Sequence, residues 1–115
     1  MIRGEIRLVD LDPVVGSEAD KRRPGVLVSN DRANATAQRL GRGLVTIVPV
    51  TSNVAHVYPF QVLLPAAATG LRVDSKAQAE QVRALSVARL GPSLGVVPGE
   101  LMAELDAALR LHLDL

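Results

Sequence analysis

The sequence lacks cysteine and tryptophan, and it contains a single tyrosine, Tyr58, and a single phenylalanine, Phe60. Without cysteine the chain can form no disulfide framework, no cysteine nucleophile and none of the usual cysteine-rich zinc sites. Proteins that bind single strands by stacking alone use several aromatic side chains. With so few aromatic residues, a pure stacking module is a poor interpretation of this sequence.

Long apolar runs are also missing. No stretch approaches the length of a membrane span, and the first residues, MIRGE, do not resemble a signal peptide. We therefore expect a soluble, cytoplasmic protein without membrane contact.

The common signatures of cofactor and metal chemistry are absent as well. There is no phosphate-binding GxxxxGK[ST] loop and no HExxH. We expect neither a cofactor nor a metal site. The two histidines, His56 and His112, fall in different elements; His56, in a polar loop, is a candidate general base, although a structural role is the favoured alternative.

The composition is that of one globular domain: 48% of the 115 residues are hydrophobic and 22% are charged. The net charge of +1 hides an asymmetry. The segment 21–42 holds six cations and one acid, a local charge of +5, whereas residues 98–115 sum to −3. A basic segment of this kind attracts a polyanion, or it is simply a solvated loop.

Short strands with turn signals dominate the predicted secondary structure. Alternating or apolar runs predict strands over about 2–9 and in PGVLVSN, GLVTIVPV, FQVLLP and PSLGVV. Within GLVTIVPV, Pro49 argues for a position at the edge of the sheet or at the end of the strand. A short helix should follow Asn30 or Asp31 as its N-cap, and SVARLG fits one helical turn. By propensity alone, VDSKAQAEQVRAL leans towards helix.

The C-terminus predicts an amphipathic helix. Leucines recur every fourth residue along one stripe, which we expect to join the core, at positions Leu101, Leu105, Leu109 and Leu113. Asp106 and Arg110 have the spacing of an i,i+4 ion pair. Together these elements predict a strongly bent sheet or small barrel with a terminal helix.

Arg23 and Thr51 are the candidate catalytic residues. RNA carries its own nucleophile, the 2′-hydroxyl, so its cleavage needs a held phosphate and positive charge where charge develops in the transition state. The arginine fork suits phosphate oxygens, and a threonine hydroxyl adds a donor. Arg23 enters one predicted strand and Thr51 leaves the next. If the two strands pair antiparallel, both residues lie at one end of the sheet.

Four segments in order resemble the motifs of the MazF/PemK toxins, the mRNA interferases of type II toxin–antitoxin systems. They are RGEIRLVDLDP, GSEADKRRPGVLVSND, VTIVPVTSN and DSKAQAEQVRAL. The resemblance runs nearly end to end and implies a single MazF-like endoribonuclease domain over residues 1–115. The implied fold is mainly β with α: an SH3-like small β-barrel of the MazF/PemK/CcdB type with a C-terminal helix. It also places 73–84 on strands, against the helix propensity.

The resemblance further implies a homodimer that cleaves single-stranded RNA at specific sequences without a metal, and that a MazE-like antitoxin inhibits. It places the catalytic arginine on Arg23 and the catalytic threonine on Thr51. Polar residues implied or expected to contact RNA are Ser17, Glu18, Lys21, Ser52, Asn53, Ser75, Glu80 and Gln81.

Three points remain open in the sequence. Arg7 stands where many members of the family have tryptophan, so that it either changes the packing and the bases preferred, or adds phosphate affinity. Lys21 and Arg22 are interpreted as steering charges. The alternatives to a nuclease are a CcdB-like toxin that binds DNA gyrase without catalysis and an RNA-binding module that does not cut.

Overall fold

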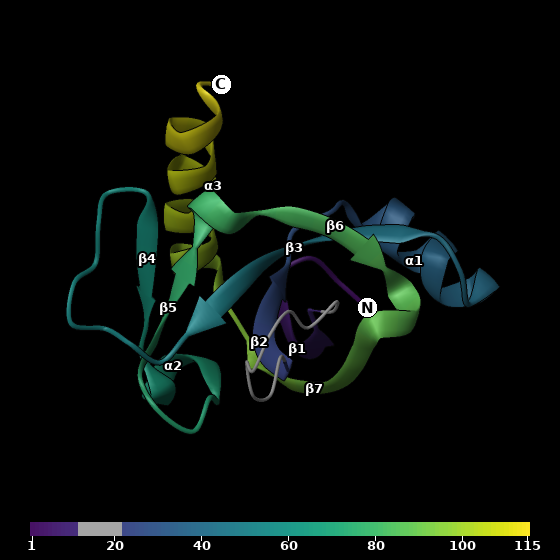
Figure 1. Cartoon of the computed structure of the whole chain (residues 1–115), viewed down its shortest axis with the longest axis horizontal. Coiled ribbons are helices and arrows are strands. Elements are labelled where there is room, and N and C mark those ends of the chain that lie inside the picture. The colour runs from purple at the N-terminus through teal and green to yellow at the C-terminus, as the bar shows by residue number, and fades with distance from the viewer. Residues whose placement is uncertain (12–21) are drawn as a thin grey trace, which may run out of the picture.

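The computed structural model describes residues 1–11 and 22–115, and Figure 1 shows their arrangement. The expected fold class, mainly β with a C-terminal helix, is confirmed. The elements in chain order are β1 (Glu5–Asp10), β2 (Arg22–Leu27), α1 (Asp31–Leu40), β3 (Leu44–Thr51), β4 (Gln61–Leu64), α2 (Ala66–Thr69), β5 (Ser75–Gln78), the 3-10 turn η1 (Ala79–Gln81), β6 (Arg83–Ser86), the 3-10 turn η2 (Val87–Arg89), β7 (Leu90–Val96) and α3 (Gly99–Leu113).

The strands of the described chain form one antiparallel sheet in the order β4-β5-β3-β2-β1-β7, with β6 paired to the first half of β3. The β-branched and leucine side chains on the inner face are fully buried, among them Ile6, Val26, Val48 and Leu64. Leu105 of α3 is buried against this cluster. One buried cluster therefore lies between the curved sheet and the C-terminal helix, and a second one, which includes Leu27 and Ile47, packs against Ala37 of α1 (Figure 1).

Pro49 lies in a central strand, but its own position is unpaired on one side, so the predicted edge character holds locally. It pairs with Gly25 of β2 on one side. On the other side β3 changes partner: residues 44–47 pair with β6, and residues 50–51 pair with β5. Proline lacks the N–H that a continuous ladder requires. The gap between the two partner strands tolerates the missing donor.

The helix after residue 30 is confirmed: the Asn30 side chain accepts a hydrogen bond from the backbone N–H of Ala33, 2.8 Å away. In contrast, the helical propensity of residues 73–85 misleads. This segment forms β5, η1 and β6, as the family resemblance implies. Its alanines Ala77 and Ala79 are fully buried in the core, where small side chains let the strand pack closely.

The helix α3 buries Leu105 completely, and Leu101 and Leu109 pack against the same cluster. Leu113 is half exposed, so the stripe leaves the core before the helix ends. The structure does not show the predicted ion pair between Asp106 and Arg110 within the helix. Its carboxylate instead lies 2.6 Å from the guanidinium of Arg3, which joins the helix to the start of the chain.

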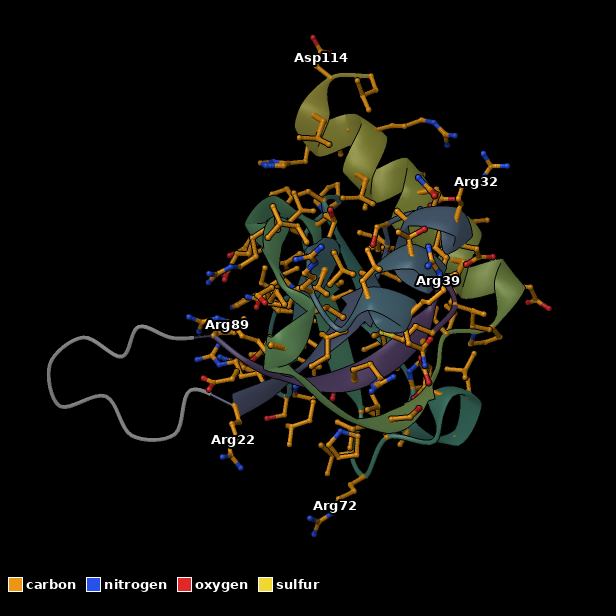
Figure 2. The ribbon with its side chains drawn as sticks, turned by 90° about the vertical axis from the view of Figure 1, so that its right-hand side faces the viewer. Arg22, Arg32, Arg39, Arg72, Arg89 and Asp114 are labelled. Atoms are coloured by element: carbon orange, nitrogen blue, oxygen red, sulfur yellow. The ribbon has the colours of Figure 1, made fainter. Side chains whose placement is uncertain are left out.

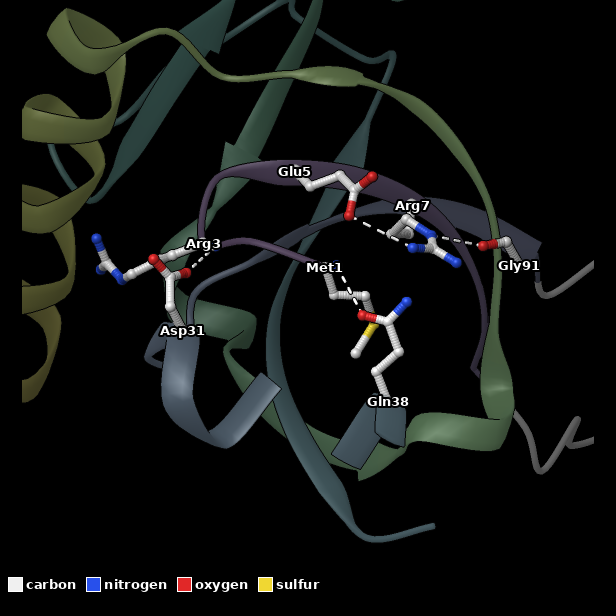
Figure 3. A network of polar contacts seen from close by, with 7 residues as sticks. All are labelled: Met1, Arg3, Glu5, Arg7, Asp31, Gln38 and Gly91. Atoms are coloured by element: carbon white, nitrogen blue, oxygen red, sulfur yellow. Dashed lines mark hydrogen bonds and ion pairs between the residues drawn. The ribbon is translucent and has the colours of Figure 1, made fainter. Parts of the chain in front are cut away.

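Arg7 is engaged within the protein, as Figure 3 shows. Its Nε donates to the carbonyl of Gly91 at 2.6 Å, and its Nη1 lies 3.4 Å from the Glu5 carboxylate. The pairing of β1 with β7 changes register on both sides of Arg7. The guanidinium therefore bridges the irregular part of the β1–β7 ladder.

Within residues 1–11 and 22–115, none of the helices combines the length and apolar character needed to cross a bilayer.

Candidate active site

The antiparallel pairing of β2 with β3 brings the two candidate catalytic residues to one end of the sheet. The β2–β3 ladder ends where Gly25 faces Pro49, so Arg23 and Thr51 both lie just beyond that pair, at the same end of the sheet. The sequence-based expectation that both lie at one sheet end is confirmed. β5 adds a third strand at this end, because Thr51 pairs with Lys76 on its other side.

Arg23 and Thr51 line a common cavity of about 430 Å³. The strand ends contribute Pro24, Val50, Ser52 and Ser75, and the segment before β5 contributes Leu71, Arg72 and Val73; Arg22, Gly70 and Leu94 complete the lining. Three of these residues are arginines, and no acidic side chain is among the described residues that form the wall. Such a concave, positively charged surface concentrates an anionic ligand.

The hydroxyl of Thr51 is oriented by the turn that follows β3. The backbone N–H of Asn53 donates to Thr51 Oγ1 at 3.2 Å, as in the turns that threonine commonly forms. This contact uses a lone pair of the oxygen and leaves its O–H free to donate. The structural interpretation of Thr51 and the catalytic one are thus compatible, because Thr51 lines the cavity and the turn does not use its O–H donor.

The remaining polar residues predicted to contact RNA divide into three groups. Ser52 and Ser75 line the cavity. Asn53, Glu80 and Gln81 are not part of its wall. Glu80 lies beyond the far end of β5, where its carboxylate accepts a hydrogen bond from Gln61 Nε2 at 2.7 Å. Ser17, Glu18 and Lys21 lie outside the described residues.

Sequence reasoning gave Arg22 only a steering role and missed Arg72. Both line the cavity, and Arg22 also lines a second cavity of about 320 Å³ formed with Asp10, Arg89 and Gly91. A signal for Arg72 was present. It lies three residues before β5, much as Arg23 lies at the start of β2, and β5 begins beside the end of β3.

The basic segment 21–42 does not form one continuous face in the single chain. Arg22 and Arg23 lie where β2 begins, at the cavity. Arg32 and Arg39 lie on α1 (Figure 2). This helix leads into the first residue of β3, whereas the cavity lies at the last residue of that strand, Thr51. Of the described cations in this segment, Arg22 and Arg23 are the two that line the cavity of the protomer.

His56 also lies away from the cavity wall. It is exposed on the loop between β3 and β4 and stacks on Tyr58. This position does not favour the general-base interpretation. Among the described residues, no group of three or more histidine, aspartate or glutamate side chains is arranged to hold a metal ion.

Comparison with known proteins identifies the class. Residues 2–113 match the family described as PemK-like, MazF-like toxin of type II toxin–antitoxin system, and the chain belongs to this family. It is 65% identical over its full length to the endoribonuclease MazF9 of Mycobacterium tuberculosis strain H37Rv, of which it covers 98%.

Solved structures agree in fold. The chain is similar to MazF from Deinococcus radiodurans, with 30% identity and a TM-score of 0.75 over 100% of this chain and 97% of the other. A MazE–MazF crystal structure from the same organism matches with 27% identity and a TM-score of 0.75, over 100% of this chain and 96% of that one. The fold is thus of the MazF/PemK type.

Proposed function

We propose that the protein is the toxin of a type II toxin–antitoxin system: a metal-independent endoribonuclease that cleaves single-stranded RNA at specific sequences in the cytoplasm. The observation that carries the proposal is the cavity that Arg23 and Thr51 share with two further arginines. Its family membership and the endoribonuclease name of its 65% identical relative support the same activity. A cognate MazE-like antitoxin is the expected inhibitor.

In this mechanism the substrate supplies the nucleophile. The 2′-oxygen attacks the adjacent phosphorus and loses its proton, and the bond to the 5′-oxygen breaks as that oxygen gains a proton. The non-bridging oxygens, which share one negative charge in the diester, gain a second one as the phosphorane forms. Arg23 stabilises this charge, and the Thr51 hydroxyl, held by the Asn53 amide, donates to one of the oxygens. Arg22 and Arg72 attract and position the flanking phosphates.

Removing the charge at residue 23 tests the assignment. Arg23→Ala should lower RNA cleavage by about 10²-fold or more, the scale seen when one positioned stabiliser of transition-state charge is lost. Thr51→Val, which keeps the shape and removes the donor, should lower the rate at saturating RNA. The matched control is Arg32→Ala, because Arg32 is also exposed but lies on α1. Equal losses in Arg23→Ala and Arg32→Ala would contradict the assignment.

The chemistry is tested on purified RNA with EDTA and without ribosomes. We expect discrete fragments with a 2′,3′-cyclic phosphate or 3′-phosphate and a free 5′-hydroxyl. A 2′-O-methyl group at the cleaved residue should block the reaction. Cleavage of that modified RNA, or a strict need for Mg²⁺, would contradict internal attack. Intact RNA together with inhibition of gyrase would instead support the CcdB-like alternative.

A further inference from the structure

The loop between β3 and β4, residues 52–60, gathers the aromatic side chains of the described chain into a ladder of three rings. Tyr58 and Phe60 stack nearly parallel, with ring centroids 5.4 Å apart and an interplanar angle of 3°. His56 stacks on Tyr58 at 6.2 Å and 29°. The aromatic residues are few, but the fold places them together on one wide loop, seen beside β4 in Figure 1.

The ladder is open to solvent at its His56 end. Tyr58 is 50% exposed, and His56 is exposed as well. Tyr58 is the one ring that stacks on His56 within the described chain, so no second ring covers its other side. An exposed stack of this kind offers a further aromatic ring a place to continue it.

A nearly buried lysine holds the ladder in place. Lys76 is 7% exposed, its Nζ donates to the carbonyl of His56 at 2.6 Å, and the same Nζ lies 5.7 Å from the centre of the Tyr58 ring. Lys76 forms no ion pair with a carboxylate of the described chain. Its charge therefore stays uncompensated beneath the rings, which favours an anionic ligand above them.

The ladder adjoins the candidate active site. Lys76 is the direct register partner of Thr51, so the two side chains leave the same face of the sheet about 5 Å apart. The loop that carries the rings begins at Ser52, a residue of the cavity wall. A strand whose phosphate is held by Arg23 and Thr51 can therefore extend over the loop.

The loop and β4 contain no aspartate or glutamate. The nearest carboxylate in the hydrogen-bond network is that of Glu80, which Gln61 binds through one oxygen, while the other oxygen is buried. The exposed surface around the rings is thus apolar and aromatic above a positive charge, with Val57 and Leu63 also exposed.

We propose that the exposed face of His56 is a stacking subsite for an unpaired base of the RNA, next to the phosphate that is cleaved. The base continues the stack of His56, Tyr58 and Phe60, and Lys76 is a positioning residue that fixes the rings before RNA binds. This proposal rests on the proposed ribonuclease function and adds a subsite to it. Base stacking of this kind is tolerant of sequence, so the subsite contributes affinity at one flanking position.

The test uses an RNA oligonucleotide that the protein cleaves, made resistant by 2′-O-methylation at the cleaved residue. We expect His56→Ala to raise its dissociation constant about 5- to 150-fold, the range for the loss of one stacked base. His56→Phe, which keeps a ring, should retain the affinity. His112→Ala is the matched control, because His112 is an exposed histidine at the end of α3.

A spectroscopic signature locates the stacked base. When 2-aminopurine is scanned through the oligonucleotide, its fluorescence should be quenched at one position beside the cleaved residue. The quenching should persist in His56→Phe and disappear in His56→Ala. In turnover with unmodified RNA, the loss in His56→Ala should appear in KM; a loss confined to kcat would indicate a general base and overturn the proposal.

The two proposals fail in different ways. If the wild-type protein cleaves RNA but His56→Ala binds the resistant oligonucleotide as tightly as wild type, the stacking subsite is wrong and the ribonuclease stands. If the wild-type protein leaves RNA intact, the ribonuclease proposal fails. If His56→Ala weakens binding of a cognate antitoxin but not of RNA, the ladder is a surface for a protein partner and the subsite is overturned.

Discussion

At the scale of single residues, Arg7 shows how context decides what a cation does. The sequence left open whether Arg7 adds phosphate affinity or changes packing. Its guanidinium lies between the Gly91 carbonyl and the Glu5 carboxylate, and Arg7 lines neither described cavity. With 21% of its side chain exposed, Arg7 belongs to the packing of β1 against β7.

Arg7→Ala should therefore lower the free energy of unfolding by about 1–3 kcal/mol, because the Gly91 carbonyl and the Glu5 carboxylate lose a charged donor in a partly buried site. We expect the dissociation constant for RNA to change less than threefold. Denaturant unfolding measures the first quantity and fluorescence anisotropy the second. Arg42→Ala, at an exposed position after α1, is the control for loss of one positive charge. A stable Arg7→Ala protein with weakened RNA binding would restore the phosphate interpretation.

At the scale of secondary-structure elements, the cavity depends on a close approach of α2 to β7. A Cβ atom added to Gly95 of β7 would lie 2.1 Å from the backbone carbonyl oxygen of Thr69 in α2. α2 leads directly into Gly70, Leu71 and Arg72 of the cavity wall, and Leu94 precedes Gly95. The absence of a side chain at residue 95 thus positions one side of the site.

Gly95→Ala should destabilise the protein by about 1–3 kcal/mol, the usual cost of overpacking, because the added Cβ meets a backbone carbonyl and not the end of a flexible side chain. Since α2 must move, RNA cleavage should also fall in the fraction that remains folded. The comparison is Gly99→Ala at the start of α3, where an added Cβ meets nothing within 4 Å. That variant should leave the melting temperature unchanged or raise it. Similar melting temperatures for the two variants would contradict the close-approach interpretation.

The elements also show what the sequence could and could not predict. The strands around Val26, Ile47 and Val62 follow from local apolar patterns, and the Asn30 cap follows from its side-chain oxygen. The antiparallel pairing that brings Arg23 and Thr51 to one end of the sheet was a condition of the sequence argument, and the structure meets that condition.

Features that depend on distant contacts could not be predicted from local patterns. The switch of partner strands at Pro49 requires knowledge of where β5 and β6 lie. The pairing of Asp106 with Arg3 spans 103 positions of the chain, so helical spacing alone pointed to Arg110. The stacking of His56, Tyr58 and Phe60 depends on the path of a loop that Lys76 holds from another strand.

At the scale of the whole molecule, a single protomer is small for the recognition of several RNA bases in sequence. Its cavity of about 430 Å³ is of the size that holds one small ligand, whereas recognition of an RNA sequence requires contact with several bases. The protomer measures 37 × 36 × 29 Å along its principal axes, so a longer groove is more easily built between two copies. We therefore expect a homodimer with an interface above about 1,000 Å².

The distribution of charge links activity to inhibition in such a dimer. Arg22, Arg23 and Arg72 line the cavity, and the described residues of its wall include no acidic side chain. The field that attracts RNA phosphates would also attract the carboxylates of an acidic, disordered antitoxin segment, which orders as it binds. RNA and the antitoxin segment should therefore exclude one another.

Competition between RNA and an acidic antitoxin peptide tests this expectation on the intact protein, after light scattering has established its mass in solution. The apparent dissociation constant for the cleavage-resistant RNA should rise in proportion to peptide concentration, because both ligands require the same arginines. A peptide with its Asp and Glu residues changed to Asn and Gln is the matched control and should compete weakly. Arg23→Ala should lower the affinity for both ligands, since each loses a charged partner.

Binding of RNA and peptide at the same time with unchanged affinities would contradict a shared site. A monomer that cleaves RNA at the full rate would contradict the groove between two copies.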